Sequence, residues 1–275
     1  MQPLEPGARR RPKSARARTR LSSVANAMRL LKAFSDDEFE IGVSDLARRL
    51  GLAKSTVHRL ASTLITERLL ERSAADGKYR LGLLLFELGS LVRRKMDVSA
   101  EARPFLKALM EKTGETVHLG VLDDHSVLYI NRIESRSALR MSFGLGARAP
   151  LHCTALGKAL LAFQPGPFIE ETIAMGLPRR TANTITGPQA FRQELAAVRA
   201  RGYAVEDEEI EAGLRSIATV VRNDSGNVIA AIGVAGPAHR LTKKVLLSYA
   251  RALMSATEAV SQRLGYQPAQ VQKRA

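Results

Sequence analysis

The segment VSDLARRLGLAKSTVHRLASTL, residues 43–64, constrains the fold of its region more than any other part of the chain. A first short helix is predicted with Ser44 as N-cap, and its inner face consists of apolar residues, Leu46, Ala47 and Leu50. Gly51 should end it, because glycine adopts the positive φ of a sharp turn easily. A second helix is predicted from Lys54, burying Val57, Leu60, Ala61 and Leu64. This spacing predicts a helix-turn-helix.

The remaining positions of the second helix carry hydrogen-bonding side chains, Lys54, Ser55, Thr56, His58 and Arg59. Each can donate to phosphates or base edges, and the Arg59 guanidinium can make a bidentate hydrogen bond to guanine. With Ser44 of the first helix, these residues are the expected DNA contacts. From the residues alone, a helical hairpin with a solvated polar face stays open as the alternative.

The residues after Arg68 predict a strand, a turn and a strand, at Leu69–Arg72, Ala74–Gly77 and Lys78–Leu81. A hairpin directly after a recognition helix is a wing, so Arg72, Lys78 and Arg80 are expected to reach the flanking DNA backbone or minor groove. A preceding helix is predicted from an apolar face that starts at Val24, with Ser22 or Ser23 as its cap. Phe39 and Ile41 predict a short strand at most. Together these elements assign residues 21–83 to a winged helix-turn-helix domain.

The charge of the chain supports a polyanionic partner. The sequence has 42 Lys and Arg against 27 Asp and Glu, a net charge of +15 over 275 residues. Such an excess is typical of proteins that bind nucleic acid or an anionic membrane surface. The densest positive charge lies in residues 1–20, a basic segment expected to be disordered. Two interpretations of this segment remain open, an arm on DNA phosphates and a passive solvated leader.

A linker helix and one further, larger domain are expected after residue 83. Residues 84–97 are predicted to form a strongly apolar linker helix that dimerises with a second copy, which suits a palindromic operator. Residues 98–268 alternate helices with strands joined by tight turns, which predicts an α+β domain with an antiparallel sheet. Its strands include residues 138–144, and its last helix is expected to run unbroken over residues 242–264. Residues 269–275 are assigned to a C-terminal tail.

Several segments resemble the isocitrate-lyase-regulator (IclR) family of bacterial transcription factors. They are LARRLGLAKSTVHRLASTL, GKYRLG, LHCTALGKALLAF, GYAVEDEEIEAGLRSIATVV and AAIGVAGP, in the family's order and spacing over residues 21–265. The resemblance implies a one-component regulator with a winged helix-turn-helix and a C-terminal GAF-like effector domain. It also implies dimers or dimers of dimers, and an effector that is a small organic acid, aromatic or keto. A repressor is expected.

The resemblance also implies the effector-binding residues, namely Leu139, Met141, Thr154, Ala155, Leu156, Glu206, Leu214, Ser216, Gly233 and Ala235. The helix start at Thr154 has independent support, because free N–H groups at a helix N-terminus bind carboxylates. The sequence departs from the family pattern where Ser216 replaces a frequent cysteine and Glu206 a frequent aspartate. Gly233 and Ala235 replace small hydroxyl residues, which is expected to enlarge the pocket.

The residues offer little for catalysis, metals or cofactors, and none of these is expected. His152 and Cys153 are neighbours in a predicted strand and so point to opposite faces. The five histidines lack metal-ligand spacing, and the acidic run from Glu206 to Glu209 is read mainly as a solvated turn. The single cysteine and the lack of a long apolar span predict a cytoplasmic protein without a membrane partner. Two alternatives remain: an enzyme that modifies small molecules with an accessory DNA-binding module, and an architectural DNA-binding protein without an effector.

Overall fold

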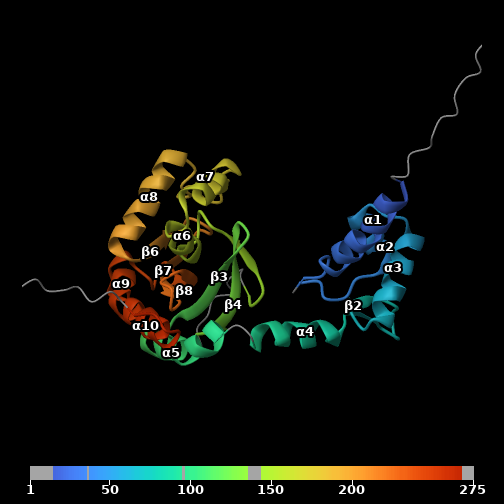
Figure 1. Cartoon of the computed structure of the whole chain (residues 1–275), viewed down its shortest axis with the longest axis horizontal. Helices are drawn as coiled ribbons and strands as arrows, with labels where there is room; N and C mark the ends of the chain where they lie inside the picture. Colours follow the sequence, from blue (N-terminus) through green and yellow to red (C-terminus); the bar gives the residue numbers. More distant parts are fainter. Residues whose placement is uncertain (1–14, 36, 95–96, 136–143, 268–275) are drawn as a thin grey trace, which may run out of the picture. The chain divides into compact units, whose positions relative to one another are not determined.

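The computed structural model describes residues 15–35, 37–94, 97–135 and 144–267. The chain divides into two compact units, residues 1–95 and 96–275 (Figure 1). Within the first unit the elements are α1 (Ala15–Leu31), α2 (Val43–Leu50), α3 (Lys54–Thr66), β1 (Leu70–Arg72), β2 (Tyr79–Leu81) and α4 (Leu83–Arg94). The fold of each unit follows from its own apolar core.

The first unit is a winged helix-turn-helix, as the sequence predicted. Leu30, Leu46, Val57 and Leu70 come together in one buried cluster that joins α1, α2, α3 and the wing. Gly51 has a φ of 64° and caps α2, as expected of the turn between the two helices. The wing strands β1 and β2 are antiparallel, and Ile41 makes a single bridge to Tyr79 of β2 in place of a strand.

Two helix starts differ from the prediction. The N-cap of α2 is Gly42, with an extended backbone, and not Ser44, which lies inside the first turn and is exposed. The helix therefore begins two residues earlier than a side-chain cap at Ser44 would allow. Helix α1 begins at Ala15, so the expected caps at Ser22 and Ser23 are wrong, and residues 15–20 of the expected disordered segment are helical.

The second unit is built on one sheet with strand order β5-β4-β3-β8-β7-β6, every neighbouring pair antiparallel. Its strands are β3 (Thr116–Asp123), β4 (Ser126–Ile133), β5 (Arg148–Pro150), β6 (Ala204–Asp207), β7 (Leu214–Arg222) and β8 (Val228–Pro237). Its helices are α5 (Asp97–Thr113), α6 (Ala155–Ala162), α7 (Gly166–Ala174), α8 (Pro188–Arg201), α9 (Lys243–Ser248) and α10 (Ala250–Arg263). The predicted α+β class is confirmed.

Helices cover both faces of this sheet (Figure 1). Helices α6, α7 and α8 pack on one face around Leu160, Phe191 and Ala231, while α5, α9 and α10 pack on the other around Leu106, Ile232 and Leu253. Alternate residues of each strand point to opposite faces, so Val117 and Leu119 of β3 belong to the α5 core and His118 between them faces α6. The sheet thus has a helix N-terminus over the centre of one face.

Other differences from the prediction lie in this unit. The last helix is interrupted at Tyr249, between α9 and α10, where the Tyr249 hydroxyl donates to the Thr113 carbonyl at 3.2 Å. Strand β5 was not foreseen, because three residues carry too little periodicity. The strand expected over residues 138–144 lies almost wholly outside the described residues. Among the helices that the structure describes, none is long and apolar enough to cross a membrane.

Candidate DNA-binding face and ligand cavity

The exposed side of α3 presents a stripe of hydrogen-bond donors. Lys54, Ser55, His58 and Arg59 are exposed, and Thr56 is half-buried beside them. The i, i+4 spacing of Lys54 with His58 and of Ser55 with Arg59 aligns these side chains along the helix. Within the described part of the chain, Lys54, His58 and Arg59 make no ion pair or side-chain hydrogen bond. These three side chains are therefore free to meet phosphates or base edges.

The wing also carries the predicted cations, but each one is engaged inside the wing. Arg72 donates from Nε to the Gly77 carbonyl at 3.2 Å and lies over the ring of Tyr79. The remaining two form ion pairs, Lys78 with Asp76 at 3.0 Å and Arg80 with Glu71 at 2.8 Å. All three cations are exposed, and exposed pairs of this kind are weak, so phosphates can compete for them. They are nevertheless less available to DNA than the side chains of α3.

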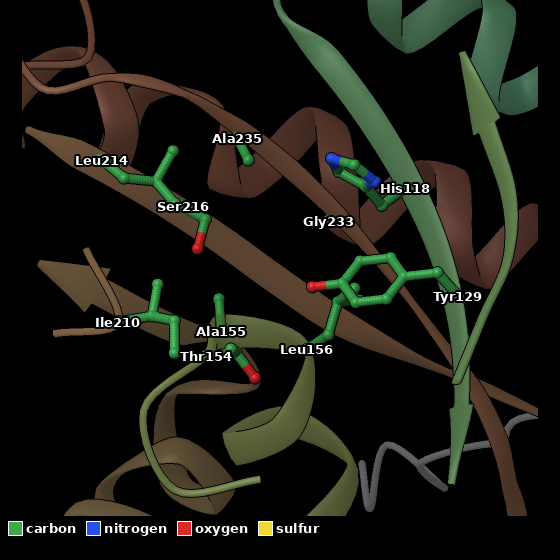
Figure 2. A pocket seen from close by; sticks show the side chains of 10 residues that line it. All are labelled: His118, Tyr129, Thr154, Ala155, Leu156, Ile210, Leu214, Ser216, Gly233 and Ala235. Carbon is green, nitrogen blue, oxygen red and sulfur yellow. The ribbon is translucent and has the colours of Figure 1, made fainter. Parts of the chain in front are cut away.

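A cavity lies between the sheet and the N-terminus of α6 (Figure 2). Its walls are formed by ten residues, His118, Tyr129, Thr154, Ala155, Leu156, Ile210, Leu214, Ser216, Gly233 and Ala235. About 430 Å³ of empty space lies between them, the open mouth included, but the centre of a water molecule reaches only about 30 Å³ of it. No lysine or arginine is among these lining residues. The cavity suits a small, thin and largely apolar molecule.

The N-terminus of α6 forms the polar end of the cavity. Thr154 is the N-cap: its Oγ1 accepts a hydrogen bond from the Gly157 N–H at 3.1 Å and donates to the Pro150 carbonyl at 2.8 Å. The first N–H groups of a helix have no intrahelical acceptor, so those of Ala155 and Leu156 have no partner from within α6. Two N–H groups and the positive end of the helix dipole are able to bind a carboxylate without a basic side chain.

Two glycines bring α6 close to its surroundings. A Cβ at Gly157 would lie 2.4 Å from the Leu151 carbonyl oxygen, so only glycine fits the first turn of this helix. A Cβ at Gly233 would lie 3.1 Å from the Ile217 carbonyl oxygen and 3.4 Å from Leu156. Gly233 therefore allows α6 to pack closely on the sheet, and it also leaves the cavity open. The sequence analysis predicted only the effect on the cavity.

Glu206 lies behind the wall of the cavity and contacts it through Ser216. The Ser216 hydroxyl donates to Glu206 Oε2 at 2.9 Å, and the Glu209 N–H donates to Oε1 at 2.8 Å. Glu206 is fully buried, and this burial raises the pKa of its carboxyl group to about 7. A group with this pKa changes charge near neutral pH, directly behind Ser216, which faces the cavity.

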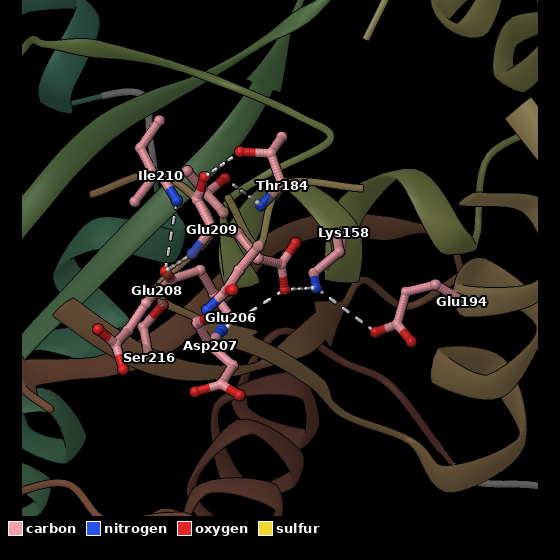
Figure 3. Close-up of polar contacts among 12 residues, drawn as sticks. Lys158, Thr184, Glu194, Glu206, Asp207, Glu208, Glu209, Ile210 and Ser216 are labelled. Carbon is pink, nitrogen blue, oxygen red and sulfur yellow. Dashed lines mark hydrogen bonds and ion pairs between the residues drawn. The ribbon is translucent and has the colours of Figure 1, made fainter. Parts of the chain in front are cut away.

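The acidic run after Glu206 is not a solvated turn, contrary to the sequence-based reading. Glu209 is buried and its Oε1 lies 2.5 Å from Nζ of Lys158, an α6 residue that is also buried, while Glu194 of α8 lies 3.5 Å from the same Nζ (Figure 3). Burial raises the pKa of Glu209, and the Lys158 ammonium opposes that shift. These charges fix the segment that carries Ile210 against α6.

The structure brings together seven of the ten residues that the resemblance implied, all except Glu206, Leu139 and Met141. Glu206 is separated from the cavity by Ser216, and Leu139 and Met141 lie outside the described residues. Sequence reasoning missed three lining residues, His118, Tyr129 and Ile210. The period-two alternation of residues 116–123 and 126–133 placed His118 and Tyr129 on a sheet face, but only strand pairing shows which face borders the cavity.

The neighbours His152 and Cys153 do not form a nucleophilic pair. Burial raises the pKa of the Cys153 thiol to about 12 and lowers the pKa of His152. The His152 ring contacts the Pro178 carbonyl through Nε2 at 3.0 Å and not the thiol. A thiolate is therefore unfavourable at neutral pH. The described residues also contain no cluster of His, Cys, Asp or Glu that could hold a metal ion.

A winged helix-turn-helix with free donors on its recognition helix, joined to a domain that encloses a small cavity, defines a DNA-binding transcriptional regulator. The comparisons with known proteins agree. Residues 23–74 match the IclR helix-turn-helix domain, and residues 91–262 match the bacterial transcriptional regulator IclR C-terminal domain. The chain belongs to the IclR family of bacterial transcriptional regulators, and it is a regulator and not an enzyme.

Similar proteins include regulators of known name. The chain is 36% identical over 247 residues to the HTH-type transcriptional regulator KdgR of Escherichia coli, covering 90% of this chain and 94% of that one. It is 30% identical to the transcriptional repressor IclR of Escherichia coli, covering 90% and 92%. Among solved structures, an IclR homologue from Microbacterium hydrocarbonoxydans complexed with 4-hydroxybenzoate has a TM-score of 0.79 and 31% identity, covering 88% and 98%.

Proposed function

We propose that this protein is a repressor whose binding to a palindromic operator is modulated by a small organic acid held in the α6 cavity. The observation that carries the proposal is the end wall of the cavity, where Ala155 and Leu156 present helix N-terminal N–H groups and no lysine or arginine is present. These donors favour a carboxylate through charge-assisted hydrogen bonds. The narrow interior favours a flat body, and the complex of a relative with 4-hydroxybenzoate supports an aromatic acid.

The recognition helix supplies the operator contacts in this proposal, with Lys54, His58 and Arg59 as its free donors. The effector must bind the DNA-competent and DNA-incompetent arrangements with different affinities, or it could not shift their populations. A palindromic operator requires a two-fold symmetric protein, and α4 offers the surface for self-association, because Leu83, Phe86 and Leu91 are 67%, 72% and 53% exposed on it.

Calorimetry with 4-hydroxybenzoate tests the effector site. Ala235 lines the cavity and is 8% exposed, so Ala235→Leu fills the space and should abolish binding of the acid to the full chain. The matched control is Ala108→Leu, the same change on the exposed side of α5, which should bind like wild type. Thermal unfolding of both variants checks that they fold. Equal affinity in Ala235→Leu and wild type would place the effector elsewhere.

A further inference from the structure

The wall of the cavity contains one buried polar side chain whose hydrogen bonding is incomplete. His118 on β3 is 4% exposed, and its Nδ1 is buried without a hydrogen-bond partner among the described residues. An unsatisfied buried polar atom is unfavourable and is rare in folded proteins, so each one calls for an explanation. The position of this atom at a ligand cavity suggests that its partner comes from the ligand.

The surroundings of His118 fix its ring and leave space beside it. Tyr129 packs against the imidazole edge to face, with the ring centroids 5.2 Å apart. In the sheet, His118 is paired with Gly233 of β8, which has no side chain, and Ala235 follows two residues later on the same face. Figure 2 shows the imidazole projecting from β3 toward this space, on the side of the cavity away from Thr154 and Ala155.

The imidazole is neutral over the physiological range. Burial, and to a smaller extent the positive charge of Arg132, its partner across β3 and β4, lower the pKa of His118 to about 3. A neutral imidazole has one N–H donor and one nitrogen acceptor. A hydroxyl group both donates and accepts, so it can pair with a ring nitrogen whether or not that nitrogen carries the proton. A carbonyl can pair only with the protonated nitrogen, and a hydrocarbon can pair with neither.

We propose that His118 is the specificity-determining residue of this cavity: it hydrogen-bonds a hydroxyl group at the end of the ligand remote from its carboxylate, so that the cavity selects hydroxy acids over the unsubstituted acids. This inference rests on the proposed function, since it takes the carboxylate to lie at the α6 N-terminus. The cavity then has two polar ends, a charged one at Ala155 and Leu156 and a neutral one at His118, separated by apolar walls.

Isothermal titration calorimetry on the full chain tests this with two matched pairs of acids, 4-hydroxybenzoate with benzoate and 4-hydroxybutyrate with butyrate. Wild type should bind one hydroxy acid about 10- to 100-fold more tightly than its partner, the scale of one buried polar group left unpaired. His118→Leu should remove this preference, and His118→Gln, which keeps a donor and an acceptor, should retain part of it. His239→Leu is the control, because His239 is exposed and lies outside the cavity wall.

A second readout does not depend on the variants folding. In wild-type protein with ¹⁵N-labelled histidine, the hydroxy acid should shift the ring nitrogens of His118, and its unsubstituted partner should shift them far less. Equal affinity for both members of each pair, a preference retained in His118→Leu, or unchanged His118 resonances in the complex would overturn the inference. Failure of all four acids to bind would instead overturn the proposed organic-acid function, and this inference with it.

Discussion

Arg59 and Arg72 are exposed arginines of the same DNA-binding unit, but they have different surroundings. Arg59 has no polar side-chain contact within the described part of the unit, whereas the Arg72 guanidinium donates to Gly77 and lies over Tyr79. A side chain without an internal partner gives up no intramolecular contact when it contacts a base, whereas an engaged side chain must first break its contacts. Exposure alone therefore does not rank DNA contacts.

Arg59→Ala should weaken binding to the operator by about 1–3 kcal/mol, and Arg72→Ala by less, because Arg59 is the free guanidinium on the recognition helix. The measurement is fluorescence anisotropy of the full chain on an operator selected from a random duplex library, with a scrambled duplex as reference. Unchanged discrimination between the two duplexes in Arg59→Ala would remove this residue from base reading.

Glu206 makes the stability of the second unit depend on pH. Its pKa is about 7 in the folded protein against 4.5 in the unfolded chain, so between these values the folded state holds a proton that the unfolded state has released. Stability is then greatest below pH 4.5 for this group and falls as pH rises to 7, by roughly 3 kcal/mol at most. Glu206→Gln should remove this fall, because glutamine is neutral throughout.

Urea unfolding of wild type and Glu206→Gln at several pH values measures this effect as a difference. The difference cancels the opposite contribution of His118, whose lowered pKa makes stability rise with pH between about 3 and 6.5. Glu258→Gln on the exposed side of α10 is the control and should leave the pH profile of wild type intact. A parallel profile for Glu206→Gln would show that this carboxyl group titrates normally.

At the scale of elements, α6 is the helix on which the cavity depends. It is buried along its whole length, and its first turn packs against Leu151 at Gly157. Lys158 forms an ion pair with Glu209 in the segment after β6. The charged Lys158 side chain is tolerated on this buried helix because the carboxylates of Glu194 and Glu209 form ion pairs with it. The position of the N–H groups at the start of α6, which we propose bind the carboxylate of the effector, is thus fixed by packing and by charge together.

Breaking this buried pair should be costly. Lys158→Met leaves Glu209 buried without its partner and should destabilise the second unit by about 3–5 kcal/mol, while adding Glu209→Gln should restore much of that loss. Denaturant unfolding of the single and double variants gives the coupling energy. The exposed pair Arg192–Glu170 on α8 and α7 is the control, and its removal should cost about 1 kcal/mol or less. A coupling as small as that of the control would contradict the assigned role.

At the scale of the whole molecule, α4 carries more apolar surface than its own unit covers. Phe86 is 72% exposed, and Leu83, Leu88 and Leu91 of the same helix are also exposed. Exposed apolar surface of this kind marks an interaction site more often than a solvated helix. A second copy of the chain is the partner we propose, because the same symmetry that a palindromic operator requires would pair identical helices.

Phe86→Glu should therefore shift the protein from dimer to monomer, since it places a charge in the expected interface. Sedimentation velocity of the full chain over a range of concentrations measures the change, and operator affinity should fall with it. Ala100→Glu, the same charge on the exposed side of α5, should leave the assembly of wild type intact. A dimer of unchanged stability in Phe86→Glu would exclude this face of α4.

The sequence by itself determined the features that depend on neighbours along the chain. The glycine turn at Gly51, the helical periods of α2 and α3, the wing hairpin and the helix start at Thr154 all follow from residues a few positions apart. Local patterns of this kind set φ, ψ and the buried face of each element, so they can be read without tertiary contacts. The family resemblance added most of the cavity residues in the same way, through motifs.

Tertiary structure decided what depends on residues distant in sequence. The buried Lys158–Glu209 pair joins positions on different elements, and the acidic run that includes Glu209 is indistinguishable by composition from a solvated turn. His118 faces the cavity because β3 pairs with β8 and places Gly233 beside it. Burial and strand pairing arise only when separate elements pack, and they set both the charge state of a side chain and the space next to it.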